Sequence, residues 1–135
     1  MRDAWHKAAI DGDGATVERL IADGVDLDGR DRHGQTALML AARHGQEAVA
    51  RILVRHGADL DATAKYGLSA LMLAVINRHA AIAEHLVDAG ANPLLRGAGA
   101  PGFAGLTARD LAEAGGLSDL AARIARAERP DPPGD

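Results

Sequence analysis

Residues 34–61 read GQTALMLAARHGQEAVARILVRHGADLD, and residues 67–94 read GLSALMLAVINRHAAIAEHLVDAGANPL. The first stretch begins at Gly34 and the second at Gly67, and the two share 12 of their 28 positions when they are aligned. The shared letters include the run ALMLA and the later pairs LV and GA. Self-similarity at a fixed step of this length indicates a chain built from repeated structural units.

The repeat extends in both directions from these two copies. The same step taken backwards places AWHKAAIDGDGATVERLIADGVDLD, residues 4–28, in register as a more divergent copy. Forwards, a longer step is needed to bring GLTARDLAEAGGLSDLAARIA, residues 105–125, into register, so the third copy carries a five-residue insertion. We therefore expect one domain over 1–127 and a disordered tail, rich in Pro and charge, over 128–135. The expected repeats are 1–33, 34–66, 67–104 and 105–127.

Each copy has the same internal pattern of apolar residues. In the second copy, helical spacing appears on both sides of a break at His44 and Gly45. Thr36 is a suitable helix N-cap, and Gly57 stands where a left-handed residue is wanted after a helix. Each copy thus predicts a short helix, a tight turn, a slightly longer antiparallel helix and a loop. Stacking the copies would bury a continuous core. The apolar positions are Leu38, Leu40, Ala41, Val49, Leu53 and Val54.

The period of 33 and the pattern GxTALMLAARxGxxxxAxxLxxxGAD resemble the ankyrin repeat. The resemblance spans residue 3 to about residue 127 and is most specific in the two central copies. It implies an all-α fold, an ankyrin-repeat solenoid of four stacked helix-turn-helix repeats whose connecting loops form β-turn fingers. The tetratricopeptide repeat fits less well, because its period is longer and its aromatic positions are missing here.

The positions that depart from the family pattern predict further features of the structure. The usual Thr-Pro-Leu-His becomes Thr-Ala-Leu-Met at residues 36–39 and Ser-Ala-Leu-Met at residues 69–72. The methionines can only pack, whereas the family's histidine ties neighbouring loops by hydrogen bonds. Lys7 takes the place of a buried leucine, and Arg123 and Arg126 accompany Ala-rich positions in the last copy. We therefore expect exposed capping repeats at both ends and an array that is complete as written.

The amino-acid composition limits which kinds of molecule we expect this chain to bind. The net charge is −4, with a single Trp, a single Tyr and a single Phe, so a nucleic-acid partner is not expected. The chain has no cysteine, which removes disulfides and thiolate chemistry. Without a signal peptide or a long apolar run, we expect a cytoplasmic chain with no membrane partner. The abundance of Ala and Arg is typical of a bacterial source.

Three motifs resemble ligand-binding or metal-binding sites, and each also has a simpler structural interpretation. GAGAPG at residues 97–102 matches a dinucleotide-binding pattern, but it follows a predicted helix, so a flexible loop is expected. DGDG at residues 11–14 lacks the later ligands of a calcium loop and fits the turn of the first repeat, with Asp13 or Gly14 as cap. His33, His44 and His79 have no zinc-ligand spacing and are expected at the solvated surface. We predict no cofactor, no metal and no enzyme activity.

The resemblance implies a site as well as a fold. Ankyrin-repeat proteins bind other proteins through a concave surface made of loop tips and the exposed faces of the first helices. The end repeats would contribute Ile10 and Asp11 on one side and Leu106 and Ala114 on the other, while Trp5 belongs in the core. The positions of this chain that match the family's variable surface are Arg32, His33, Gln35, Arg43, His44, Lys65, Tyr66, Leu68, Ile76, Asn77 and Phe103.

These residues predict an apolar strip with a basic border. The strip is formed by Tyr66, Leu68, Ile76 and Phe103, and its border by Arg32, Arg43 and Lys65. Interfaces favour Tyr and Arg, so we expect a non-catalytic, monomeric module of adaptor, inhibitor or immunity type that binds another protein. In the plainer interpretation, Tyr66 and Phe103 cover gaps between loops. The alternative functions are a self-associating structural protein, such as a homodimer, and ligand or metal binding at the insertion, residues 95–104.

Overall fold

The computed structural model describes residues 4–99 and 102–128. Within these ranges the chain is all-helical: eight α-helices follow one another as four pairs joined by short turns, and no strand is formed. The first helix of each pair has 7 or 8 residues and the second has 9 to 11, as predicted. The pairs are α1 (Ala4–Asp11) with α2 (Gly14–Ala22), α3 (Ala37–His44) with α4 (Glu47–Arg55), α5 (Ala70–Ile76) with α6 (Ala80–Asp88), and α7 (Ala108–Ala114) with α8 (Ser118–Glu128).

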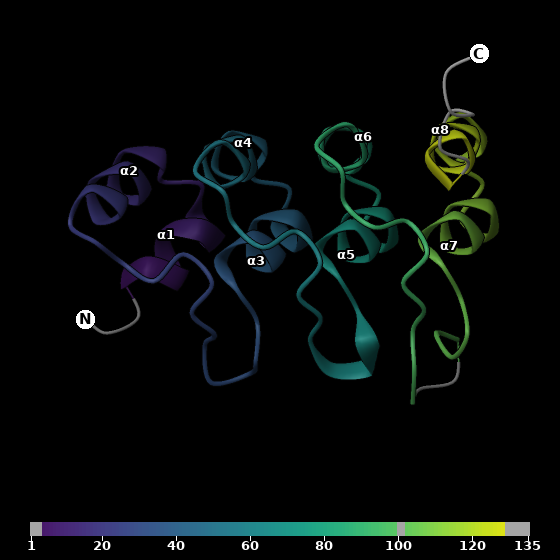
Figure 1. The fold of residues 1–135 in the computed structure, drawn as a ribbon, viewed down its shortest axis with the longest axis horizontal. Helices are drawn as coiled ribbons and strands as arrows, with labels where there is room; N and C mark the ends of the chain where they lie inside the picture. The colour runs from purple at the N-terminus through teal and green to yellow at the C-terminus, as the bar shows by residue number, and fades with distance from the viewer. Residues whose placement is uncertain (1–3, 100–101, 129–135) are drawn as a thin grey trace, which may run out of the picture.

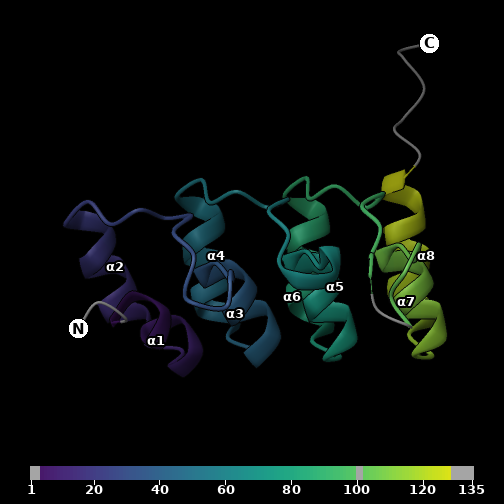
Figure 2. The same ribbon diagram turned by 90° about the horizontal axis from the view of Figure 1, so that it is seen from below.

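The pairs stand side by side in chain order and form two layers of helices (Figure 1). The first helices make an inner layer, the second helices make an outer layer, and the loops project beyond the inner layer. Seen from below, the four pairs form a single row (Figure 2). Each inner helix packs on the next inner helix, and each outer helix on the next outer helix. The expected stacked fold is therefore confirmed.

Small residues at one repeated position let the inner helices pack closely. Ala8, Ala41, Ala74 and Ala112 occupy this position and are all buried. Larger aliphatic side chains, such as Leu53 of the outer layer, complete the core. The alignment of the four copies in the sequence places these same alanines at one position, with a longer step before the last copy. Their shared burial agrees with that alignment.

Local hydrogen bonds set where the helices begin. Thr36 and Ser69 are buried, and their hydroxyls accept hydrogen bonds from the amides of Met39 and Met72, each at 3.2 Å. At α7 the Thr107 amide donates to the Asp110 carboxylate at 3.0 Å. This hydrogen bond is the main reason that the pKa of Asp110 lies below its usual value. These caps satisfy amides that have no partner inside the helix.

The capping residues predicted at the turns next to the helices are also present. The Asp13 carboxylate accepts a hydrogen bond from the Thr16 amide at 3.1 Å, so DGDG is the turn before α2. Gly57 has the predicted left-handed conformation, with φ of 89°. The Asp28 carboxylate receives the Asp59 amide at 2.8 Å, and at the same position of the next copy Asp61 receives the Asn92 amide at 2.7 Å. These two aspartates thus join the loops that follow α2, α4 and α6.

The two ends of the row differ from each other. The Lys7 side chain is 73% exposed and forms an ion pair with Asp11, which agrees with an exposed first face. Arg123 instead turns back to α6 and contacts the Asp88 carboxylate at 2.6 Å, so it joins the last two pairs rather than marking a free face. Helix α8 continues to Glu128, one residue past the boundary expected at 127. Residues 129–135 of the tail expected over 128–135, and residues 100–101 of the insertion, lie outside the described residues.

Candidate functional site

The loop before α3 is held by an aspartate that faces its own backbone. Asp31 Oδ1 accepts hydrogen bonds from the amides of His33, at 2.8 Å, and Gln35, at 3.0 Å. Burial alone would raise the pKa of Asp31, but these hydrogen bonds outweigh it and hold the pKa below its usual value. The loop tip therefore presents Arg32 and His33, both exposed, while the carboxylate is engaged within the loop.

Arg30 joins this loop to the next one. Its guanidinium donates to the Gly34 carbonyl at 2.7 Å and to the Thr63 carbonyl at 2.9 Å. Arg96 occupies the equivalent position two copies later and donates to the Gly105 carbonyl at 2.7 Å. Because one guanidinium reaches two loops, the loops before α3 and α5 are held in a fixed relation.

The loop before α5 presents the exposed aromatic ring. Its 3₁₀ turn, η1 (Lys65–Gly67), places Tyr66 at a φ of 65°, in the left-handed region. The Tyr66 side chain is 38% exposed, and the Lys65 ammonium lies 4.9 Å from the ring centroid. The Tyr66 carbonyl accepts the Ala98 amide at 2.7 Å, so the loop is also joined to the one that follows.

The described residues at the two ends of the insertion lie close together, and Phe103 lies beside Tyr66. Gly97 forms a bridge with Ala104, and its amide donates to the Leu106 carbonyl at 2.9 Å. The Tyr66 and Phe103 ring centroids are 6.2 Å apart, and the rings are tilted by 36°. The two aromatics therefore contact one another across neighbouring loops, and together they border a hollow.

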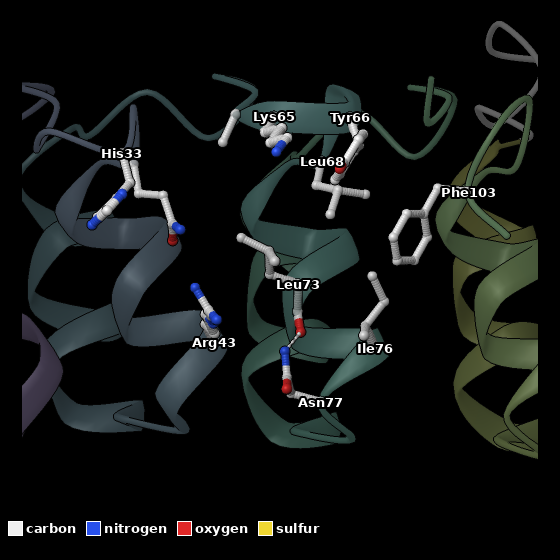
Figure 3. Close-up of a pocket in the computed structure, with 11 residues that line it drawn as sticks. His33, Arg43, Lys65, Tyr66, Leu68, Leu73, Ile76, Asn77 and Phe103 are labelled. Atoms are coloured by element: carbon white, nitrogen blue, oxygen red, sulfur yellow. Dashed lines mark hydrogen bonds between the residues drawn. The ribbon is translucent and has the colours of Figure 1, made fainter. Parts of the chain in front are cut away.

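This hollow has a volume of about 400 Å³ and lies between the loop tips and the inner helices (Figure 3). It brings together nine of the eleven predicted site residues. The apolar side chains Leu68, Ile76 and Phe103 form one part of its wall, and His33 and Arg43 lie on the side of α3. The lining residues are His33, Gln35, Arg43, Ala64, Lys65, Tyr66, Leu68, Leu73, Ile76, Asn77 and Phe103.

A second hollow of about 540 Å³ adjoins the first on its basic side. It is lined by Arg32 together with four residues of the first hollow: His33, Gln35, Arg43 and Lys65. The two hollows are therefore neighbours that share part of their walls. Apolar side chains dominate one part of this surface and cationic side chains dominate the other.

A family model described as ankyrin repeats in three copies matches residues 5–96 of the chain. The chain belongs to the ankyrin-repeat family. Ankyrin repeats are generally protein–protein interaction modules without catalytic activity. The match ends before α7, so the fourth helix pair of this ankyrin-repeat chain lies beyond it. A comparison with curated proteins found no match.

Met39 and Met72, which depart from the ankyrin pattern, are core residues in this structure. Both side chains are only 1% exposed and fill the core where the family carries histidine. Hydrogen bonds between neighbouring loops come instead from Arg30 and from the Ala98 amide. The first copy keeps a histidine at this position: His6 Nε2 lies 2.9 Å from the Gly29 carbonyl oxygen, within hydrogen-bond distance.

Some predicted site residues differ from the expectation. Leu68 is only 9% exposed, so it lines the hollow from a buried position rather than forming part of an exposed strip. His44 is exposed at the end of α3 but lines neither hollow. Ile10 and Asp11 line a separate depression with Arg32 and His33, and Leu106 and Ala114 lie outside both hollows.

Sequence reasoning missed Leu73 and Ala64, which also line the first hollow. The signal was weak, because Leu73 aligns with a core leucine and is 8% exposed. In the part of the chain that the structure describes, no three His, Asp or Glu side chains are grouped so that they could hold a metal ion. None of the described helices is both long and apolar enough to span a membrane.

Proposed function

We propose that this ankyrin-repeat chain is a non-catalytic module that binds a partner protein at its docking face. The docking face is the surface of loop tips and inner helices that lines the two hollows. The observation that carries the proposal is the apolar hollow of about 400 Å³ that opens beside exposed basic side chains. Such a module acts by occupying its partner's surface, as an adaptor, an inhibitor or an immunity protein does.

The chemistry of the docking face suits a protein partner. Interface hot spots are rich in Tyr and Arg and form around pockets that exclude water, inside a polar rim. Tyr66 and Phe103 frame the apolar hollow, and Arg43 and Lys65 stand beside it. An aliphatic or aromatic side chain of a partner would lose its water in this hollow, which is the main source of binding free energy.

The docking face is also organised before any partner arrives. Arg30 holds two loop tips together, and the Tyr66 carbonyl is tied to the Ala98 amide. A surface that is already ordered loses less conformational entropy on binding, so more of the contact energy appears as affinity. These hydrogen bonds favour a docking face that is used as it stands.

Site-specific photo-cross-linking tests the proposal. p-Benzoylphenylalanine is placed at Lys65 on the docking face or at Ala48, which is exposed on the outer helix α4. In cells of the source organism, we expect position 65 to give an adduct with another protein and position 48 to give much less. Equal adducts from both positions, or none from position 65, would overturn the proposal.

Self-association is the second candidate, because the exposed Tyr66 could equally anchor a second copy of the chain. Light scattering of the purified chain separates the two. A monomer across a wide concentration range, combined with an adduct to a different protein, supports the binding module. A dimer whose cross-link at position 65 joins two copies supports self-association instead.

A further inference from the structure

The docking face carries apolar and basic side chains next to one another, and the Lys65 ammonium lies over the Tyr66 ring. The hollow framed by Tyr66 and Phe103 shares part of its wall with the cationic hollow. Figure 3 shows Ile76 and Phe103 at one side of this surface and His33 and Arg43 at the other. A ligand that spans both hollows would contact an apolar pocket and, beside it, positively charged side chains.

Within the described ranges of the chain, basic side chains line both hollows without an acidic residue among them. The whole chain carries a net charge of −4, yet no Asp or Glu is found among the described residues that line the two hollows. The neighbouring Asp31 keeps its negative charge while it accepts hydrogen bonds from the amides of His33 and Gln35, and it lines a separate depression with Arg32 and His33. The ion pairs found among the described residues use other basic side chains; these are Lys7, Arg51, Arg55, His56, Arg109 and Arg123.

Arg32, Arg43 and Lys65 are therefore exposed cations without an ion-pair partner in the described part of the chain. Guanidinium groups bind carboxylates through paired, charge-assisted hydrogen bonds. In an acidic protein, a cluster of unpaired cations beside an apolar pocket would repel a basic ligand. It would also attract an acidic ligand over a distance of several ångströms.

We propose that the partner presents an acidic and apolar segment, in which Asp or Glu residues stand within a few residues of one bulky aliphatic or aromatic side chain. The bulky side chain enters the hollow between Tyr66 and Phe103, and the carboxylates pair with Arg32, Arg43 and Lys65. This inference rests on the proposed function and gives the chemical class of the partner. Charge complementarity selects this occupant over a basic or neutral segment.

Selection from a random peptide library against the full chain tests this proposal. We expect the selected peptides to combine Asp or Glu with Leu, Ile, Phe or Trp. Resynthesised with Gln in place of Glu, they should bind about tenfold more weakly or worse, as measured by fluorescence anisotropy. Their affinity for the unaltered chain should also fall several-fold as salt rises from low to high concentration.

Two matched variants locate the interaction. Arg43→Glu with Lys65→Glu reverses two charges on the docking face, whereas Arg19→Glu with Arg126→Glu reverses two exposed charges elsewhere. Both change the net charge by the same amount. We expect the first variant to lose at least about tenfold in affinity and the second to keep its affinity. Arg43→Gln with Lys65→Gln should fall between them and covers the case in which the reversal disturbs folding.

The remaining outcomes separate this inference from the proposed function. Selected peptides that are neutral, yet lose binding with Tyr66→Ala, would overturn the acidic segment and leave the docking face standing. Equal binding to the charge-reversed variant, or no selected peptide at all, would also overturn the inference, while the cross-linking test still decides the proposed function. A dimer that dissociates with Arg43→Glu and Lys65→Glu would make the occupant a second copy and overturn it as well.

Discussion

The imidazole of His79 lies directly against the backbone of Gly45 in the preceding helix pair. A Cβ atom built on Gly45 would stand 2.7 Å from Cε1 of that ring. Gln46 occupies the equivalent position one copy earlier, and its amide nitrogen donates to the Ile10 carbonyl at 2.7 Å. The residues before α4 and α6 therefore pack over the turn of the previous pair. His79 is thus a packing residue, and not the freely solvated histidine that was expected.

Gly45→Ala should destabilise the chain for two separable reasons. The residue has a φ of 75°, which costs an alanine about 1 kcal/mol, and its new Cβ would meet the His79 ring. The matched control is Gly57→Ala, with a φ of 89° and no heavy atom within 4 Å of its Cβ. In urea unfolding we expect Gly45→Ala to lose about 1–3 kcal/mol more than Gly57→Ala. Adding His79→Ala should shrink that excess, and equal losses in the two glycine variants would contradict the contact.

Leu68→Ala and Tyr66→Ala should differ sharply in stability, although the residues are neighbours in one loop. Leu68 is 9% exposed, so its truncation should cost about 2–4 kcal/mol. Tyr66 is 38% exposed, so its loss should cost about 1 kcal/mol or less. Thermal unfolding of the two variants measures the difference. Similar midpoints would mean that the Tyr66–Phe103 contact supports the fold as strongly as the buried leucine does.

Arg30→Ala should loosen two loops at once. The variant loses the hydrogen bonds to the carbonyls of Gly34 and Thr63, each a modest contribution of about 1 kcal/mol. We expect faster amide hydrogen exchange in the loops before α3 and α5, with little change in the outer helices. Arg32→Ala, which alters an exposed neighbour, is the control and should leave both loops protected. Unchanged exchange in Arg30→Ala would show that backbone contacts alone order these tips.

Asp31 should contribute to acid sensitivity. Its pKa is lower in the folded chain than its ordinary value of 3.8, so the folded state favours the charged carboxylate. The resulting stability is present above about pH 4 and is lost as the pH falls through the lower, folded pKa. In Asp31→Asn, which keeps one acceptor oxygen but cannot ionise, urea unfolding should show a shallower loss of stability between pH 5 and pH 3 than in the wild type.

Asp31→Ala provides the comparison for that measurement. It removes the acceptor of the His33 and Gln35 amides, so it should be less stable than Asp31→Asn at every pH. If the wild type and Asp31→Asn lose stability in parallel as the pH falls, the acid sensitivity arises at other carboxylates. Asp110, which the Thr107 amide binds, would then be the next residue to test.

The sequence by itself determined the helices, their caps and their register. The caps at Thr36 and Ser69 depend on residues three positions away, and the alanine positions follow from a fixed step along the chain. These are short-range properties, and the repeat supplies the long-range neighbour because each pair packs on a copy of itself. Most residues of the docking face could be named in the same way, from their place in the repeat.

Only the tertiary structure decided how those residues face one another. Three of these relations depend on side-chain directions and on an insertion that breaks the period. They are the burial of Leu68, the contact of Phe103 with Tyr66 and the ion pair of Arg123 with Asp88. The gathering of Arg43 and Lys65 in hollows that no described Asp or Glu lines likewise depends on how the folded loops lie. Such relations join segments that are far apart along the chain or lie on either side of the insertion, so spacing along the chain cannot specify them. They form only when the folded helices hold the loops beside one another.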